Sequence, residues 1–353
     1  MSLARLRLAR TEGVGPALHA RLMARHGSAD AALAALGARA FPRDAAEREM
    51  DALAAMGARL LFLGDRDYPP LLALIDDAPL VLAGLGSLAP LSQRGVGVVG
   101  ARNASATARR FAEDLADALA VLGISIISGL ARGIDAAAHA GALRSGTTIA
   151  AIAGGLDRPY PRENAGLQAR IVAEGGLVLS EAPLGTAPLA RHFPRRNRIV
   201  AGLSLGVVVI EAALQSGTLI TARLAAEAGR ELFAVPGSPL DPRSRGSNDL
   251  IRRGARLTET AEDVLQFLPE APAALPILRL AELPAAPAEN ASDAPAASGT
   301  AAQVLELIGA TPIPVDELGR RCQLSPAALS TILLDLELAG RIETLPGNRV
   351  ALA

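Results

Sequence analysis

Short apolar runs alternate with amphipathic stretches through the middle of this chain. A continuous apolar run of about four to eight residues is typical of a strand buried on both faces, as in a parallel sheet. The stretches between the runs have the helical period of about 3.6 residues that crossover helices need. The pattern predicts strands over residues 96–99, 124–128, 148–153, 177–180, 207–210 and 232–235. We therefore expect a doubly wound, Rossmann-like α/β domain with a parallel sheet over residues 92–268.

A helical unit is predicted before this domain, over residues 1–91. Gly13-Val14-Gly15 separates two amphipathic runs, and Pro16 takes the first position of the second helix. This is the outline of a helix-hairpin-helix, whose glycine turn can offer backbone N–H groups to a phosphate. A tight turn between two packed helices accounts for the same residues equally well.

Two further segments are predicted after it. Residues 269–299 are rich in Pro and Ala without periodicity, which is typical of a semi-rigid linker. In residues 300–353, Ser325 can cap a helix whose apolar face is followed by a hairpin around Pro346-Gly347-Asn348. This pattern predicts a winged-helix domain.

The composition restricts the chemistry. All 35 basic residues are arginine, because the chain contains no lysine, and the formal net charge is -1. The absence of lysine excludes a Walker-type phosphate loop and Schiff-base chemistry. Aromatic residues make up only 2% of the chain, so platforms for stacking bases are scarce. Any bound nucleic acid is therefore expected to be held mainly through its phosphates.

Cysteine content and hydropathy indicate a compartment. Cys322 is the only cysteine, which excludes an internal disulfide and a cysteine-based zinc site and fits a reducing compartment. The first residues, MSLARLRLARTEG, contain too many arginines for a signal peptide, and no apolar run approaches the ~20 residues of a membrane span. We expect a cytoplasmic protein that binds no membrane, no metal and no organic cofactor.

The turn after the first predicted strand favours an anion. Gly95, Gly97 and Gly100 have the spacing of a dinucleotide fingerprint, but the first two lie within the strand, where that fingerprint does not begin. An NAD site is therefore not expected. Gly100 begins the turn, Arg102 lies within it, and a helix is predicted to begin near Ser105. Backbone N–H groups at a helix N-terminus and a neighbouring guanidinium together suit a phosphate.

Loops rich in glycine, serine, proline or arginine follow five of the six predicted strands, and the carboxyl ends of parallel strands meet at one edge of a sheet. A mononucleotide would not need so many cations, whereas a strand of linked phosphates would use them. Pairing with Asp157, Glu163, Glu181 and Asp241 is an equally good explanation for any single arginine. The candidate DNA-binding residues are Gly100, Arg102, Ser105, Ser128, Gly129, Arg132, Arg158, Arg162, Arg195, Arg196, Asn197, Arg198, Ser216, Gly217 and Thr218.

Asp135 and His139 stand one helical turn apart in GIDAAAHAGAL. We expect a hydrogen-bonded pair that orients the loop, because neither a nucleophile nor a set of metal ligands accompanies them in this motif. No catalytic residue is assigned, and an enzyme is not expected.

Ordered blocks from Val96 to Ile251 resemble the DNA-processing protein A family (DprA, also called Smf). The blocks are VGVVGAR, SGLARGIDAAAHAGAL, GGLDRPYP, FPRRNRIVAGLS, SGTLITA, FAVPG and GSNDLI. The resemblance implies an extended Rossmann domain that binds single-stranded DNA, often as a homodimer, and passes it to the RecA recombinase during natural transformation. It also implies a sterile-alpha-motif or helix-hairpin-helix domain at the N-terminus and a winged helix at the C-terminus.

Motif by motif, the resemblance assigns the family's DNA-binding arginine to Arg102 and its basic residue after the Tyr-Pro pair to Arg162. The family's Gly-Ser-Arg turn reads Gly-Ala-Arg here, so one hydroxyl is missing. The expected recognition helix, residues 325–339, has no arginine and carries Asp335 and Glu337, which phosphates would repel. A protein contact or a regulatory role is therefore expected for the winged helix.

Two alternatives remain. The sheet also resembles the lysine-decarboxylase-like nucleotide hydrolases, whose signature Pro-Gly-Gly-x-Gly-Thr-x-x-Glu supplies a catalytic glutamate. Here the matching stretch is LQSGTLIT, with Thr221 in place of that glutamate. A nucleotide-binding or nucleotide-hydrolysing enzyme of that superfamily is one alternative, and a nucleotide-sensing module without catalysis is the other.

Overall fold

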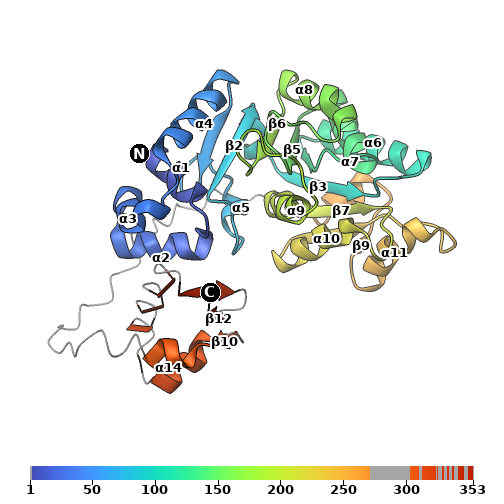
Figure 1. Cartoon of the computed structure of the whole chain (residues 1–353). Coiled ribbons are helices and arrows are strands. Elements are labelled where there is room, and N and C mark those ends of the chain that lie inside the picture. Colours follow the sequence, from blue (N-terminus) through green and yellow to red (C-terminus); the bar gives the residue numbers. More distant parts are fainter. Residues whose placement is uncertain are drawn as a thin grey trace.

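A nine-stranded sheet runs through the centre of the structure (Figure 1). The structure is a computed structural model, and it describes residues 2–270, 303–309, 312–322, 324, 328–329, 332–333, 336–337, 341–345 and 349–352. The strand order is β1-β2-β6-β5-β4-β3-β7-β8-β9. The strands are β1 (Arg59–Phe62), β2 (Val81–Gly86), β3 (Gly95–Gly100), β4 (Ser125–Ser128), β5 (Thr148–Ile152), β6 (Leu177–Ser180), β7 (Gly206–Ile210), β8 (Glu231–Ala234) and β9 (Arg256–Leu257).

From β6 to β9 in this order, neighbouring strands are parallel. From β3 the chain proceeds through β4 and β5 to β6 on one side, and then places β7 on the other side of β3. The carboxyl ends of β3 and β7 therefore form the topological switch point, where open α/β sheets take their ligands. The predicted doubly wound α/β fold is confirmed.

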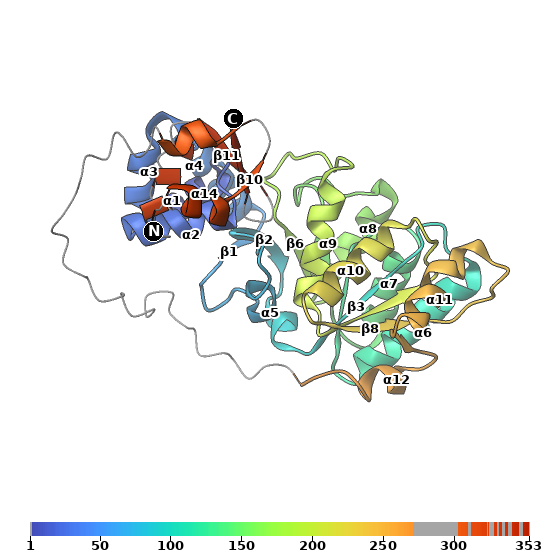
Figure 2. The same ribbon diagram turned by 90° about the horizontal axis from the view of Figure 1, so that it is seen from below.

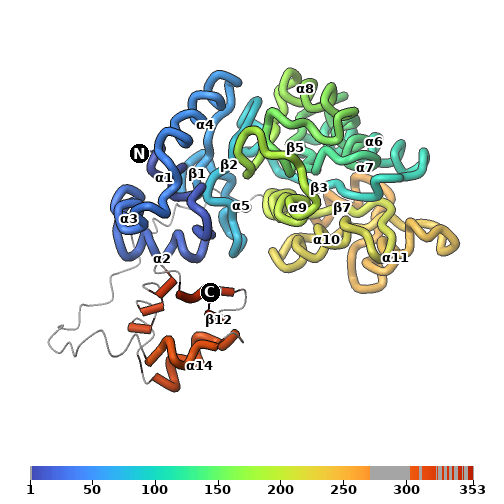
Figure 3. Tube along the Cα trace, viewed as in Figure 1, coloured from blue at the N-terminus to red at the C-terminus, as the bar shows by residue number. Residues whose placement is uncertain are grey.

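Helices cover both faces of the sheet (Figure 3). Val96 and Val98 of β3 pack into one core, whereas Val99 packs into the other, because successive residues of a strand point to opposite faces. The first face is covered by α6 (Ala106–Val121), α7 (Ile134–Ser145), α8 (Ala165–Ala173) and α12 (Ala261–Leu265). The second is covered by α5 (Pro70–Ala73), α9 (His192–Leu203), α10 (Gly217–Glu227) and α11 (Arg245–Arg252).

The structure differs from the sequence prediction between residues 59 and 86. The helical pattern expected to continue to residue 91 is interrupted by β1 and β2, which extend the sheet in antiparallel register. Periodicity alone does not distinguish a short buried strand from a buried helix in apolar runs of this length. Pairing of β2 with β6 decides the matter here, and no local pattern reveals that pairing.

The helices before β1 are α1 (Ser2–Arg10), α2 (Pro16–His26), α3 (Ala29–Leu36) and α4 (Arg43–Ala55). Pro16 takes the first position of α2, as predicted, and Gly13 in the preceding turn has a φ of +78°, which favours glycine. Helices α1 to α3 share a core of their own, and α4 packs with α1 against β1 and β2. In the described part of the chain, no helix is long and apolar enough to cross a membrane.

The C-terminal domain has a second sheet, in the order β10-β12-β11. Its elements include β10 (Ile313–Pro314), α14 (Val315–Cys322), β11 (Ile342–Leu345) and β12 (Arg349–Leu352). The predicted winged helix is confirmed. The domain lies beside the N-terminal helices (Figures 1 and 2), where Arg21 of α2 forms an ion pair of 2.7 Å with Glu337.

Some predicted features lie outside the described residues. These are the linker from residue 271 onward, the turn at 346–348 and part of the predicted recognition helix at 325–339, including Asp335.

A pair of glycines tests the packing of the first face. A Cβ atom on Gly141 of α7 would lie 2.1 Å from the backbone oxygen of Glu113 on α6. Gly141→Ala should therefore lower the free energy of unfolding by about 1 to 3 kcal/mol. Gly166 near the start of α8 has nothing within 4 Å of that position, so Gly166→Ala should raise it by roughly 0.5 to 1 kcal/mol. Urea unfolding of both variants measures the difference, and equal effects would contradict the α6–α7 contact.

Candidate nucleic-acid interface

The turn after β3 leads the chain from the sheet into α6. Gly100 has no space for a side chain, because a Cβ atom there would lie 2.0 Å from the carbonyl oxygen of Ile210 on β7. Ser105 is the N-cap of α6, as predicted, and its hydroxyl accepts the backbone N–H of Ala108 at 3.0 Å. The anion at this helix end belongs to the protein itself. The carboxylate of Glu211, directly after β7, accepts the N–H of Ser105 at 2.8 Å and its hydroxyl at 2.6 Å.

These contacts give two predicted DNA ligands a role inside the protein, and their contact with DNA stays a prediction. Gly100 is required by the close approach of β3 and β7, and Ser105 binds an internal carboxylate. Sequence reasoning identified the anion site but not its occupant, because Glu211 is distant in sequence and stands in no phosphate-binding motif.

Four more predicted DNA ligands are buried and engaged inside the protein. The hydroxyl of Ser128 donates to the carbonyl oxygen of Val98 at 2.6 Å. A Cβ atom on Gly129 would lie 1.0 Å from a terminal nitrogen of Arg196, whose side chain is only 6% exposed. Arg198 forms ion pairs with Glu181 at 2.8 Å and with Asp77 at 3.2 Å. Ser128, Gly129, Arg196 and Arg198 therefore support the surrounding loops from inside the protein, and their contact with DNA stays a prediction.

The start of α10 also satisfies its own polar groups. Ser216 caps the helix by accepting the N–H of Thr218 at 3.1 Å, and its hydroxyl donates to that of Thr218. The Thr218 hydroxyl donates to the carbonyl oxygen of Gly100 at 2.9 Å. The side-chain amide of Asn197 donates to the carbonyl oxygen of Gly217 at 3.5 Å. Both hydroxyl protons are thus used within the protein, whereas Gly217 is exposed.

The remaining predicted arginines are exposed. Arg132 donates to Glu163 at 2.8 Å, and Arg158 and Arg195 each lie 3.4 Å from a carboxylate, of Asp157 and Glu181 respectively. For Arg102 and Arg162, the described residues provide no hydrogen bond and no ion pair. Two exposed arginines that the sequence reasoning left out of the site, Arg191 and Arg245, also have no carboxylate partner within those residues.

Two aromatic rings lie beside Arg102 or close to it. The rings of Tyr160, in the loop after β5, and Phe193, on α9, meet edge to face with centroids 5.6 Å apart. The guanidinium of Arg102 lies 4.9 Å from the centroid of the Phe193 ring, within cation–π range. We call Arg102, Tyr160 and Phe193, together with Arg162 two residues after Tyr160 in sequence, the aromatic–arginine cluster.

The sequence reasoning missed the aromatic half of this cluster, because a low aromatic content does not reveal where the few rings gather. The available signal was position: Tyr160 and Phe193 each follow a predicted strand in an arginine-containing loop.

A buried polar network supports the loops below this cluster. Asp135 accepts the backbone N–H groups of Gly129 and Ala131 at 3.2 and 3.3 Å and lies 3.7 Å from a guanidinium nitrogen of Arg196. Burial raises the pKa of Asp135 and lowers that of Arg196, and the charge of each opposes the shift of the other. The predicted loop-orienting role of Asp135 agrees with these bonds.

His139 binds Thr148 and not Asp135, the partner that the sequence predicts. Its Nδ1 lies 2.7 Å from the hydroxyl of Thr148, not near Asp135. That hydroxyl already donates to the carbonyl oxygen of Ile126, so Nδ1 of His139 carries the proton and donates it. Burial lowers the pKa of His139 to about 3, and the charge of Arg196 adds to the effect.

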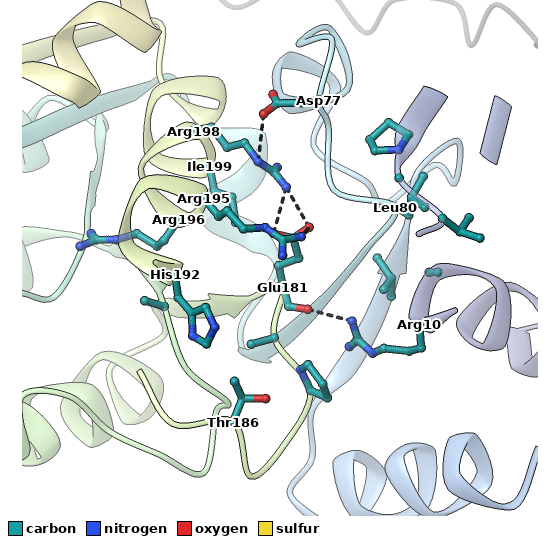
Figure 4. A pocket seen from close by; sticks show the side chains of 18 of the residues that line it. Arg10, Asp77, Leu80, Glu181, Thr186, His192, Arg195, Arg196, Arg198 and Ile199 are labelled. Carbon is teal, nitrogen blue, oxygen red and sulfur yellow. Dashed lines mark hydrogen bonds and ion pairs between the residues drawn. The ribbon is translucent and has the colours of Figure 1, made fainter. Parts of the chain in front are cut away.

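A cleft of about 650 Å³ separates the α1–α2 turn from α9 (Figure 4). Glu181 lies in this cleft, where its carboxylate binds Arg198 and its carbonyl oxygen accepts a hydrogen bond of 2.9 Å from Arg10. Arg10 is itself paired with Glu49 at 2.7 Å. The bond from Arg10 to Glu181 thus joins the N-terminal helices to the sheet across the cleft. Because the guanidinium groups of Arg10 and Arg198 are already paired, they add little positive charge to the candidate interface.

Comparison with known proteins identifies the family. A family model described as DNA recombination-mediator protein A matches residues 59–269 and so begins at β1. The chain belongs to the DNA recombination-mediator protein A family. A DprA-like N-terminal HHH domain matches residues 1–52, and a DprA winged helix domain matches residues 284–348.

Members of this family are similar in sequence and structure. Protein Smf of Escherichia coli (strain K12) is 41% identical over 316 residues, which cover 88% of this chain and 82% of Smf. The X-ray structure of DNA processing protein A from Streptococcus pneumoniae has 36% identity and a TM-score of 0.64, over 76% of this chain and 97% of that one. DNA processing protein A from Helicobacter pylori, whose structure concerns a single-stranded DNA binding mode, has 30% identity and a TM-score of 0.54, over 59% and 94%.

The buried histidine gives a pH-dependent prediction. His139 has a pKa of about 3 when folded and 6.5 as a free side chain, so the unfolded chain binds the extra proton below pH 6.5. Its contribution to stability is present above that pH and falls by up to about 1.4 kcal/mol per pH unit as the pH decreases toward 3. His139→Asn keeps an N–H donor for Thr148 but cannot titrate.

Urea unfolding of the wild type and of this variant between pH 7 and pH 4.5 checks the prediction. The wild type should lose stability more steeply as the pH falls. Asp135 and Arg196 are present in both proteins, so subtracting one curve from the other cancels their contributions. Parallel curves would contradict the neutral, buried His139.

Proposed function

We propose that this protein binds single-stranded DNA along the carboxyl edge of its parallel sheet and acts as a recombination mediator that delivers the strand to RecA. The aromatic–arginine cluster is the observation that carries the proposal. It combines guanidinium groups that have no carboxylate partner among the described residues with rings that a base can reach, since Tyr160 is 46% exposed.

The chemistry of the cluster favours a single strand over a duplex. Arginine binds phosphates of either form, but an aromatic ring stacks on the face of a base only where that face is free. The single-stranded DNA binding mode of the Helicobacter pylori relative supports the same ligand. Membership of the recombination-mediator family supports delivery to RecA.

We also propose that the protein forms a homodimer and acts in the cytoplasm. Leu257 on the edge strand β9 is 49% exposed, and Phe267 nearby in sequence is 38% exposed. A second copy covering this edge would bury both side chains and the unpaired backbone of β9.

The reducing cytoplasm, where RecA acts on DNA, fits a chain whose only cysteine is Cys322.

We further propose that the protein acts by binding and not by catalysis. The position that carries a glutamate in the lysine-decarboxylase-like hydrolases holds Thr221, which is 3% exposed on α10. A threonine hydroxyl does not replace a carboxylate as general acid or base. This favours the binding protein over the nucleotide hydrolase.

Substitution of Arg102 tests the proposed interface. Arg102→Ala should weaken binding of a fluorescent oligo-dT by about 1 to 3 kcal/mol, the range for hydrogen bonds to charged groups. Arg102→Lys should restore only part of the loss, because an ammonium lacks the planar fork. Arg223→Ala on α10 is the matched control, since Arg223 is also exposed but pairs with Glu227. Wild-type affinity of a folded Arg102→Ala variant would refute the site.

Delivery to the recombinase is tested with purified RecA. Single-stranded DNA covered by a single-strand-binding protein should be taken over by RecA at least about tenfold faster when this protein is present, as followed by the DNA-dependent ATPase activity of RecA. Arg102→Ala should lose most of this acceleration. If the wild type binds oligo-dT but does not accelerate RecA, the mediator role is rejected and the proposal that the protein binds single-stranded DNA is kept.

A further inference from the structure

The carboxyl ends of β3 and β7 lie side by side, with Gly100 paired to Ile210. This switch point is where doubly wound folds bind free nucleotides, and they do so through the N–H groups at the start of the helix after the first strand. In this protein that helix is α6, with 16 residues, and its N-cap is Ser105.

Glu211 places a carboxylate at this N-cap. One carboxylate oxygen accepts the N–H of Ser105 at 2.8 Å, and the other accepts its hydroxyl at 2.6 Å. Two oxygens of one anion on the backbone and side chain of an N-cap reproduce the way in which such a helix holds a phosphate.

The backbone of Glu211 adopts a conformation that favours glycine, with a φ of +48°. Directly after β7 this conformation places the carboxylate beside α6. Hydrogen bonds tie the turn after β3 to its neighbours: Ala101 donates its N–H to Ile210 at 3.3 Å, and Thr218 donates to Gly100 at 2.9 Å.

We propose that Glu211 is a specificity-determining residue: an internal anion that excludes the phosphate of a free nucleotide from the start of α6. Phosphate recognition is then left to the exposed arginines farther out along the carboxyl edge. Those cations are spread over several loops, so they suit a polymer and bind a mononucleotide poorly. The second half of this inference rests on the proposed function, whereas the exclusion of free nucleotides does not.

Glu211→Gly is the most direct test, because glycine accepts the backbone conformation without strain and removes the carboxylate. AMP is the probe, titrated into the full-length protein by isothermal calorimetry. Glu211→Gly should bind AMP at least about tenfold more tightly than the wild type does. Adding Ser105→Ala to this variant should remove most of the gain, which locates the new site at α6. Glu227→Gln removes an exposed carboxylate from α10 and should leave AMP affinity unchanged.

Glu211→Gln provides a second variant that keeps the side-chain volume, and thermal unfolding of each variant verifies folding. AMP affinity that stays at the wild-type level in the folded Gly and Gln variants overturns the proposal, as does a gain that survives Ser105→Ala. Oligo-dT binding is measured in parallel. A gain for AMP in a protein whose wild type fails to bind oligo-dT would keep the role of Glu211 and reject the proposed function.

Discussion

The carboxyl edge of the sheet depends on one buried ion pair, between Asp135 and Arg196. Arg196 occupies the space that Gly129 leaves by having no side chain, and Asp135 holds the N–H groups of Gly129 and Ala131. Both charged groups are removed from water, a cost that only their mutual contact and these hydrogen bonds offset. The same helix that contributes Arg196 carries Phe193 and Arg195 toward the surface, so the buried pair fixes the position of groups in the candidate interface.

Charge along this edge is divided between an inner and an outer layer. In the inner layer, charged side chains bind partners within the protein. Glu211 accepts a hydrogen bond from Ser105, Glu181 forms an ion pair with Arg198, and Asp135 lies near Arg196. In the outer layer, Arg102 and Arg162 have no carboxylate partner within the described residues, and Arg102 lies beside the ring of Phe193. A net charge of -1 is therefore compatible with an interface for a polyanion, because the local field depends on where the charged groups lie on the surface and not on the total charge.

The parallel sheet, the winged helix and the anion-binding character of the turn after β3 could be predicted from sequence, because apolar period, caps and glycine turns are local signals. The two antiparallel strands β1 and β2 could not, since β2 is identified by its pairing with β6, and β1 by its pairing with β2. In FPRRNR, two neighbouring arginines differ in burial: Arg195 is exposed and Arg196 is buried. The rotation of α9 depends on distant partners such as Asp135, and local sequence does not contain that information.

The salt dependence of binding tests the central claim most directly. Affinities of the wild-type protein for oligo-dT and for AMP are measured by fluorescence anisotropy between 50 and 300 mM NaCl. If Arg102 and Arg162 each neutralise a phosphate, log affinity for oligo-dT should fall against log salt with a slope of about -1.4 or steeper, at about -0.7 per phosphate. AMP should bind at least about a hundredfold more weakly. A slope near zero, or AMP affinity equal to that of oligo-dT, would contradict an interface built for a strand of linked phosphates.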